Sequence, residues 1–250
     1  MINIMRLLLI NEWRYQYPGP KYFMIHFLAM ALGISAYWFT SEAIGSAIQQ
    51  VDGWHGLTYF QYIVIGELFV VLPIASLQIF IRVVHQLHQL NNLEDIILNH
   101  RSPIKSLYAV ASSLMLKEAV YFVFWLIIAA VSFDFSHWRW DQWMSLILIM
   151  LVTFIFFMQM GFLCAILYMN FGRGQGVVSQ ISYLFSLLSG VYFPAEIIVK
   201  KLGVHVTYFS PLTVYIREVR NVFSGGVLQQ PLFFLMLIII SFVSVTYFTK

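Results

Sequence analysis

The stretch "LSGVYFPAEIIVKKLGVHVTYFSPLTVYIREVR", residues 188–220, interrupts a chain that otherwise consists mainly of long apolar runs. It begins as the end of one such run, meets Pro194, and gains charged residues before the next run starts. Proline lacks a backbone N–H donor and ends a helix. The stretch therefore predicts that one helix ends near Pro194 and that a charged connection leads to the next helix. What this connection does depends on whether the helices lie in water or in lipid.

The composition indicates a lipid bilayer as that solvent. Hydrophobic residues make up 60% of the 250 residues and charged residues only 10%, whereas soluble domains carry about 25% charged residues. The mean hydropathy is +0.80. A bilayer crossing takes roughly 20 mainly apolar residues, and six windows reach about this length: 22–39, 59–81, 107–133, 143–169, 177–193 and 232–248.

These windows are too long and continuous for the strands of a membrane β-barrel, which alternate over about 10 residues. We therefore predict an all-α membrane protein in which residues 1–250 form a single transmembrane domain with six transmembrane helices. Residues 1–20 mix charged, aromatic and aliphatic side chains, as expected for a helix at the membrane interface. The formal net charge of +3 comes without a basic tract, so nothing indicates nucleic acid as a partner.

The distribution of Lys and Arg predicts that both termini are cytoplasmic, because these residues prefer short cytoplasmic loops. Positive side chains occur before the first window, after the second and after the fourth: Arg6, Arg14, Lys21, Arg82, Arg101, Lys105 and Arg173. The connection 42–56 has none. The connection 194–230 breaks the rule, since it is predicted to be external and yet carries four of them, but it is also the longest connection, where the rule is weaker.

A short capped helix is predicted over residues 91–100, in the cytoplasmic loop after the second window. Asn91 and Glu94 have the spacing of a capping box. Leu93, Ile96 and Ile97 share one face by helical spacing. This apolar ridge can tuck against the headgroups or the bundle, or it can dock into the groove of a partner protein.

Two segments together resemble the type-2 ABC export permeases. "NLEDIILNHRSPIKSLY", residues 92–108, is similar to the coupling-helix loop of that family. The opening stretch is similar to its re-entrant element between the fifth and sixth helices, where a Ser-Gly…Phe-Pro sequence precedes a Pro-Leu-Thr…Arg sequence. A Leu-Pro pair that often follows in the family is replaced here by "EIIVKK". The matching residues are Ser189, Gly190, Phe193, Pro194, Pro211, Leu212, Thr213 and Arg220.

The resemblance implies the permease half of an ATP-driven exporter in a prokaryotic inner membrane, working as a homodimer or with a similar second permease. Its cargo would be a lipid-linked glycan, a lipid or a hydrophobic compound. Residues 194–220 would form an external re-entrant segment that acts as a gate. An ATP-binding cassette subunit, carrying ATP and Mg²⁺, would contact Asn92, Leu93, Glu94, Asp95, Ile96, Ile97, Leu98 and Arg101.

The chain itself offers no catalytic or metal site. The phosphate-binding pattern G-x-x-x-x-G-K-[ST] does not occur, and "GRGQG" at 172–176 lacks the lysine. We therefore expect ATP hydrolysis on a separate chain. His85 and His88 are spaced to share a metal ion, but they lack a third His or Cys nearby.

Two charges fall inside apolar windows, where charged side chains are costly and usually pair or face the protein interior. We count depth from the predicted cytoplasmic ends of the two helices, residues 81 and 105. At 1.5 Å per residue, Glu67 lies roughly 21 Å from the first of these ends and Lys117 roughly 18 Å from the second. The similar depth predicts an intramembrane ion pair between Glu67 and Lys117. The alternative is a proton or cation relay, which would make the protein an ATP-independent secondary transporter or channel.

Overall fold

A computed structural model describes residues 20–48, 56–89, 103–133, 135, 138–171, 175–194 and 210–248. The helices in these ranges are α2 (Pro20–Ile48), α3 (Tyr59–Gln89), α5 (Pro103–Ser132), α6 (Trp140–Phe171), α7 (Gln175–Leu188), α9 (Pro211–Phe223) and α10 (Pro231–Phe248). No strand occurs within the described ranges. The prediction of an all-α protein is confirmed.

Each of the six predicted windows falls on a separate helix, but the helices differ in their capacity to span a bilayer. Residues 59–85 of α3 and 140–171 of α6 are long and apolar enough to cross, among the residues the structure describes. Gly176–Leu188 and Pro231–Val243 are shorter apolar helices. The fifth window was expected to continue to residue 193, whereas α7 ends at Leu188. The number of crossings therefore stays a prediction.

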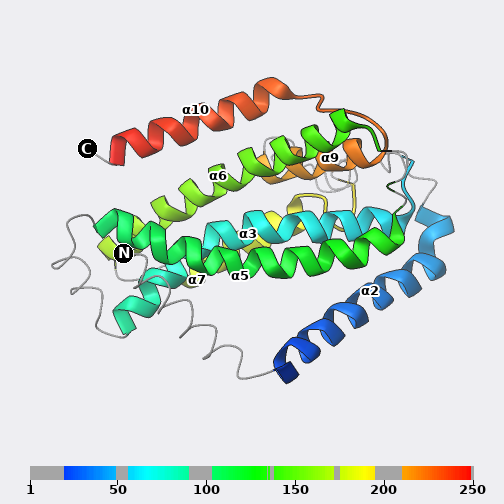
Figure 1. Cartoon of the computed structure of the whole chain (residues 1–250), viewed down its shortest axis with the longest axis horizontal. Coiled ribbons are helices and arrows are strands. Elements are labelled where there is room, and N and C mark those ends of the chain that lie inside the picture. Colours follow the sequence, from blue (N-terminus) through cyan, green and yellow to red (C-terminus); the bar gives the residue numbers. More distant parts are fainter. Residues whose placement is uncertain are drawn as a thin grey trace.

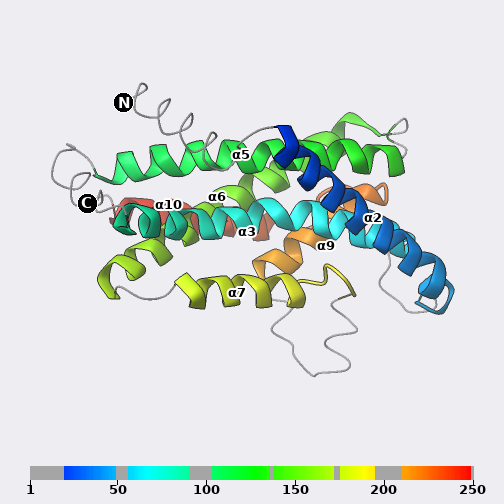
Figure 2. The ribbon, with the colours of Figure 1, turned by 90° about the horizontal axis from the view of Figure 1, so that it is seen from below.

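Helix α3 lies at the centre of the bundle and contacts α2, α5, α6, α7 and α9 (Figure 1). The last residues of α5 and α9 and the first residues of α6 lie at one end of the bundle, whereas the last residues of α6 and the first of α7 lie at the other (Figures 1 and 2). We call these the outer end and the inner end, following the orientation predicted from the Lys and Arg distribution.

Aromatic contacts along α3 show which residues of α5, α6 and α9 lie level with its outer and inner halves. In the outer half, the ring of Phe69 packs edge-on against Phe122 of α5 and Phe223 of α9, with centroids 5.7 and 5.6 Å apart. In the inner half, the ring of Phe80 packs against Tyr108 of α5 and Phe162 of α6 at 4.8 and 5.5 Å. The core therefore has an outer and an inner cluster, both centred on α3.

Helices α3 and α6 approach each other closely at Gly161. A Cβ atom added there would lie 2.7 Å from the carbonyl oxygens of both Ser76 and Leu77. Such a contact is closer than real Cβ atoms make. A small residue is thus required for backbones to pack this closely, as is common between membrane helices.

Large apolar side chains cover the outside of the bundle. Leu32 of α2, Leu184 of α7, and Leu232 and Phe242 of α10 are all exposed. An apolar surface of this extent is unsuited to water and matches the lipid environment that the composition predicts.

Helix α9 differs from its neighbours because it is short, carries charged residues among its apolar ones and is almost wholly buried. It packs against α3, α6 and α7 inside the bundle, and it lies beside the outer half of α6 (Figures 1 and 2). Even Glu218 and Arg220 are only 1% and 3% exposed. The part of the predicted external segment that the structure describes is therefore an integral layer of the core.

Candidate functional site at the outer end of the bundle

The predicted Ser-Gly…Phe-Pro segment forms the turn that ends α7. The Ser189 N–H donates to the Phe185 carbonyl at 2.9 Å, and its hydroxyl donates to the Ser186 carbonyl at 2.7 Å. Gly190 has φ of 84°, in the left-handed region that favours glycine at helix ends. Ser189, Gly190 and Pro194 are buried, while Phe193 is exposed.

Arg220 of α9 ties this turn to α3. Its Nη1 donates to the Gly190 carbonyl at 2.7 Å. Its Nη2 donates to the carbonyls of Val191 and Tyr62 at 2.9 and 3.0 Å. The guanidinium carbon also lies 3.3 Å from the centroid of the Tyr62 ring, a cation–π contact. We call Arg220, Tyr62, Gly190, Val191 and Gly66 the arginine clamp.

Gly66 provides the space that the clamp occupies. A Cβ atom at this position would lie 2.6 Å from Arg220 Nη2 and 2.8 Å from the Val191 oxygen. The Tyr62 hydroxyl adds a second donor to the Gly190 carbonyl at 3.1 Å. Because hydrogen bonds to a charged group stabilise by roughly 1.5–3 kcal/mol each, the clamp is a strong local connection among α3, α9 and the end of α7.

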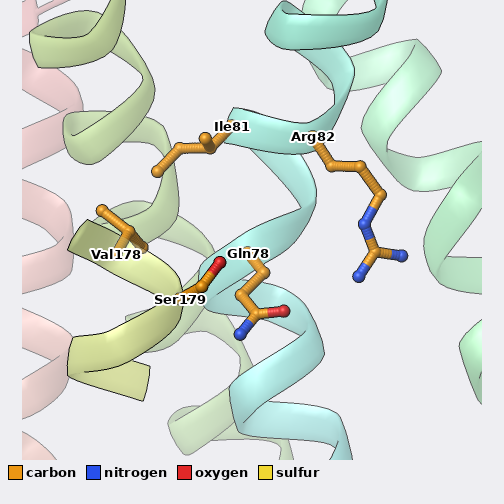
Figure 3. A pocket seen from close by; sticks show the side chains of 5 residues that line it. All are labelled: Gln78, Ile81, Arg82, Val178 and Ser179. Atoms are coloured by element: carbon orange, nitrogen blue, oxygen red, sulfur yellow. The ribbon is translucent and has the colours of Figure 1, made fainter. Parts of the chain in front are cut away.

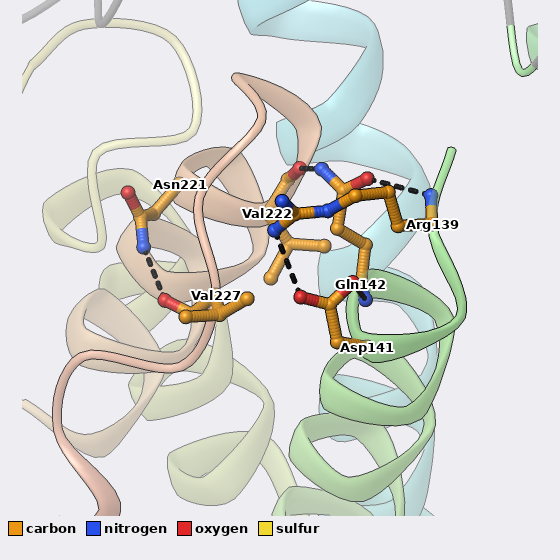
Figure 4. Close-up of polar contacts among 6 residues, drawn as sticks. All are labelled: Arg139, Asp141, Gln142, Asn221, Val222 and Val227. Carbon is orange, nitrogen blue, oxygen red and sulfur yellow. Dashed lines mark hydrogen bonds and ion pairs between the residues drawn. The ribbon is translucent and has the colours of Figure 1, made fainter. Parts of the chain in front are cut away.

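Figure 4 shows how the last turn of α9 is fixed to the start of α6. Gln142 Nε2 donates to the Val222 carbonyl at 3.3 Å, and the Arg139 N–H donates to Gln142 Oε1 at 2.9 Å. The Arg139–Asp141 ion pair beside it is 2.8 Å long, but both side chains are mostly exposed. Exposed pairs contribute little, so the buried amide of Gln142 is the important contact.

Glu218 connects α9 to the segment that leads into α10. Its carboxylate accepts the Gln229 N–H at 2.8 Å. Burial raises the pKa of the Glu218 carboxyl, opposed by backbone hydrogen bonds from Gln229 and Gln230 and by the charge of Arg217. Of these effects burial is the largest, so the position disfavours the ionised form.

Glu67 contacts tyrosine hydroxyls from two other segments. The Tyr37 hydroxyl of α2 donates to Glu67 Oε1 at 3.1 Å. The Tyr192 hydroxyl, two residues beyond Gly190, also lies near the Glu67 carboxylate. The carboxylate thereby links α2 to the turn held by Arg220. Sequence reasoning missed these partners, because neutral hydroxyl donors are not revealed by a search for opposite charges.

The predicted Glu67–Lys117 pair stays a prediction, because the Lys117 side chain lies outside the part of the chain that the structure describes. The Phe69–Phe122 contact places Lys117 about seven residues, or roughly 10 Å, nearer the inner end than Glu67. Its neighbour Glu118 forms an ion pair with Arg82, with 3.5 Å between Oε1 and Nη1.

At the inner end, a small open pocket of about 110 Å³ lies between α3 and α7 (Figure 3). Its lining residues are Gln78, Ile81, Arg82, Val178 and Ser179.

His85 Nδ1 lies 2.8 Å from the Tyr168 hydroxyl. The described residues contain no group of three or more His, Cys, Asp or Glu side chains that could hold a metal ion.

The predicted coupling helix at 91–100 falls outside the described residues, as do residues 1–19 of the predicted interfacial helix at 1–20 and residues 195–209 of the predicted re-entrant segment at 194–220. The predicted contacts of Asn92, Leu93, Glu94, Asp95, Ile96, Ile97, Leu98 and Arg101 with an ATPase subunit therefore stay predictions. All eight predicted gate residues are described. Of these, the structure brings Gly190 into direct contact with Arg220, with Ser189 beside them in the same turn.

A comparison with known protein families gives one match that covers most of the chain. The family model described as ABC-2 type transporter matches residues 5–224. The matched region includes the arginine clamp and all of α9 and ends before α10. A comparison with curated proteins finds no match.

Proposed function

Since the chain belongs to the ABC-2 type transporter family and is a membrane permease, we propose that it is the export subunit of an ATP-driven transporter whose outer gate is held by the arginine clamp. The observation that carries this proposal is the bonding of Arg220 to Gly190, Val191 and Tyr62. These bonds attach the start of the external segment to the central helix.

Helix α3 supplies a mechanical route between the two ends of the bundle. It is 31 residues long, or about 45 Å. Its outer half carries Tyr62 and Gly66 of the clamp, and its inner end leads into the loop proposed to hold the coupling helix at 91–100. Movement of an ATPase subunit against that loop would be transmitted along α3 to the turn at Gly190.

ATP and Mg²⁺ would bind to a separate ATP-binding cassette chain, since the present sequence lacks a phosphate-binding loop. Closure of the ATPase subunits would favour one arrangement of the bundle over another and so shift the population between inward-open and outward-open states. A second permease, either a copy of this chain or a similar protein, would complete the transport path.

The proposed cargo is amphipathic: a lipid-linked glycan, a lipid or a hydrophobic compound. The apolar exterior of α2, α7 and α10 supports entry from or release into the bilayer. The proposed location is a prokaryotic inner membrane with both termini in the cytoplasm.

Co-purification tests this proposal directly. We expect the full chain to purify with a P-loop ATPase, and the complex to show vanadate-sensitive ATP hydrolysis in proteoliposomes. Substitution of the ridge residues Ile96→Asp and Ile97→Asp should release the ATPase, while Ile240→Asn on the exposed face of α10 serves as a control. A chain that transports cargo with no nucleotide-hydrolysing partner would contradict the proposal.

A second candidate is an ATP-independent transporter or channel that uses Glu67. The observation that favours it is the hydrogen bond from the Tyr37 hydroxyl to this membrane-embedded carboxylate, beside which the Tyr192 hydroxyl also lies. Transport by the chain without any ATPase partner, lost in a Glu67→Gln variant that keeps its fold, would support this candidate and the predicted relay with Lys117.

A further inference from the structure

The N-terminus of α9 is a buried helix end whose usual cap is not formed. Ser210 occupies the N-cap position with φ of −67° and ψ of 123°, but its hydroxyl makes no capping hydrogen bond. An N-cap serine ordinarily accepts a bond from one of the first backbone N–H groups of the helix. Ser210 is only 8% exposed, and its Oγ has no partner among the described residues.

Thr213, in the same first turn, has a second buried hydroxyl without a partner. It is 4% exposed, and the described part of the chain offers its Oγ1 no hydrogen bond. Pro211 has no N–H, and the Val214 N–H donates to the Ser210 carbonyl at 3.1 Å. The N–H groups of Leu212 and Thr213 have no acceptor within the helix, because the geometry of a first turn provides none.

This helix end lies deep in the bundle rather than at its surface. The Gln142–Val222 hydrogen bond fixes the last turn of α9 at the outer end. Because α9 has 13 residues, its first residue lies about 18 Å further inward. Figures 1 and 2 show the start of α9 near the middle of the bundle's length.

A third hydroxyl occurs at a similar depth. Thr153 of α6 is fully buried, and its Oγ1 lacks a partner among the residues described. Counted inward from the Gln142–Val222 contact, Thr153 lies about 16 Å and Thr213 about 14 Å from the outer end. Unsatisfied buried polar atoms are rare in native proteins, so these three hydroxyls at similar depth need a partner that the described residues do not supply.

The electrostatics of this end favour an anion. A helix N-terminus carries the equivalent of about half a positive charge, and free N–H and O–H donors complement phosphate or carboxylate oxygens. Glu218, the acidic residue of α9, lies about two helical turns away from this end of the helix. Transporters of other architectures place the N-termini of broken helices against anionic substrate groups near the bilayer midplane.

We propose that the N-terminus of α9, with the Ser210 and Thr213 hydroxyls, binds the phosphate or carboxylate group of an amphiphile within the bilayer. The inference rests on the proposed transport function for the identity of this amphiphile as cargo. Binding itself needs no ATPase subunit.

Native mass spectrometry of the full chain in a neutral maltoside detergent tests the site. The probes are dodecyl phosphate and dodecyltrimethylammonium, which share one tail and differ in charge. We expect the wild-type chain to prefer dodecyl phosphate. Thr213→Val and Ser210→Ala should each weaken its binding about tenfold, the loss expected for one hydrogen bond to a charged group.

Ser182→Ala is the matched control, because this buried hydroxyl already donates to the Val178 carbonyl at 2.7 Å. Its binding of dodecyl phosphate should equal that of the wild type. Thr213→Val removes an unpartnered hydroxyl while keeping the side-chain shape, so its thermal stability should not fall. Loss of binding without loss of stability is therefore the predicted signature.

Displacement of dodecyl phosphate by millimolar inorganic phosphate would assign the site to free phosphate, and resistance to displacement would assign it to a lipid-borne group. Both results support an anion site. Unchanged binding in Thr213→Val and Ser210→Ala, or a preference for the ammonium probe, would overturn it. Neither of those results would affect the ATPase test of the proposed function.

Discussion

Arg220 donates a 2.7 Å hydrogen bond to the Gly190 carbonyl, so a buried cation of α9 holds the left-handed turn that ends α7. The acceptors of Arg220 in this turn and in α3 are backbone carbonyls, which can be released without separating two opposite charges. A turn fixed in this way is suited to a gate that must open and close again.

Gly190→Ala should destabilise the protein by about 1–2 kcal/mol, because a side chain at φ of 84° meets the following carbonyl. The matched control is Gly176→Ala, since a Cβ atom at that position of α7 would meet nothing within 4 Å. Thermal unfolding of the two variants in detergent measures the difference. Equal midpoints would show that the turn is not held in the left-handed conformation.

Gly66→Ala should displace the arginine clamp, because the added methyl group would lie 2.6 Å from Arg220 Nη2. We expect a lower unfolding temperature and faster proteolysis within residues 195–209, which follow the turn. Gly33→Ala in α2 has open space around the new methyl group and should be neutral or stabilising by up to about 1 kcal/mol. Proteolysis at wild-type rates in Gly66→Ala would contradict the role assigned to this glycine.

Gly161→Ala should separate α6 from α3, since its Cβ atom would lie 2.7 Å from two backbone carbonyl oxygens. Overpacking of this kind costs typically 1–3 kcal/mol. The expected result is a lower unfolding temperature with retained helix content by circular dichroism. A variant as stable as the wild type would contradict the close approach of the α3 and α6 backbones at this position.

Glu218 should make stability depend on pH. Burial raises the pKa of this carboxyl in the folded protein above its ordinary value of 4.5. As pH rises from about 4.5, the unfolded chain loses the proton first and binds fewer protons than the folded chain, so stability falls until the raised pKa is passed.

Glu218→Gln should flatten this part of the pH profile, because a glutamine does not titrate. Glu42→Gln, at an exposed position of α2, should keep the wild-type slope. Thermal midpoints measured from pH 4 to pH 8 give the comparison. A wild-type slope retained in Glu218→Gln would assign the pH dependence to another group.

The bundle could be predicted from the sequence because a bilayer requires long apolar helices, and each apolar window does fall on a helix. The early end of α7 could not. Val191, Tyr192 and Phe193 continue its apolar run, and the break is set by the left-handed conformation of Gly190. Hydropathy does not record backbone conformation.

The site was predicted in part. The resemblance named Gly190 and Arg220 as candidate gate residues, a role that stays a prediction. Their contact was not foreseen, because carbonyl acceptors are present at every residue and give no sequence signal. The six predicted crossings and the resemblance placed the segment that contains α9 outside, although its Lys and Arg residues ran against that placement. Most residues of α9 are buried in the core, which hydropathy did not predict. Tertiary contacts that satisfy Glu218 and Arg220 make that burial possible.

The most direct test of the account is the passive leak of a fluorescent amphiphile through proteoliposomes that contain the full complex without ATP. Arg220→Ala removes the donors to Gly190, Val191 and Tyr62, and Arg139→Ala removes an exposed arginine at the same end of the bundle as a control. We expect the amphiphile to leak from vesicles with Arg220→Ala and to be retained by vesicles with Arg139→Ala or the wild type. A folded Arg220→Ala complex that stays tight and still transports with ATP would contradict it.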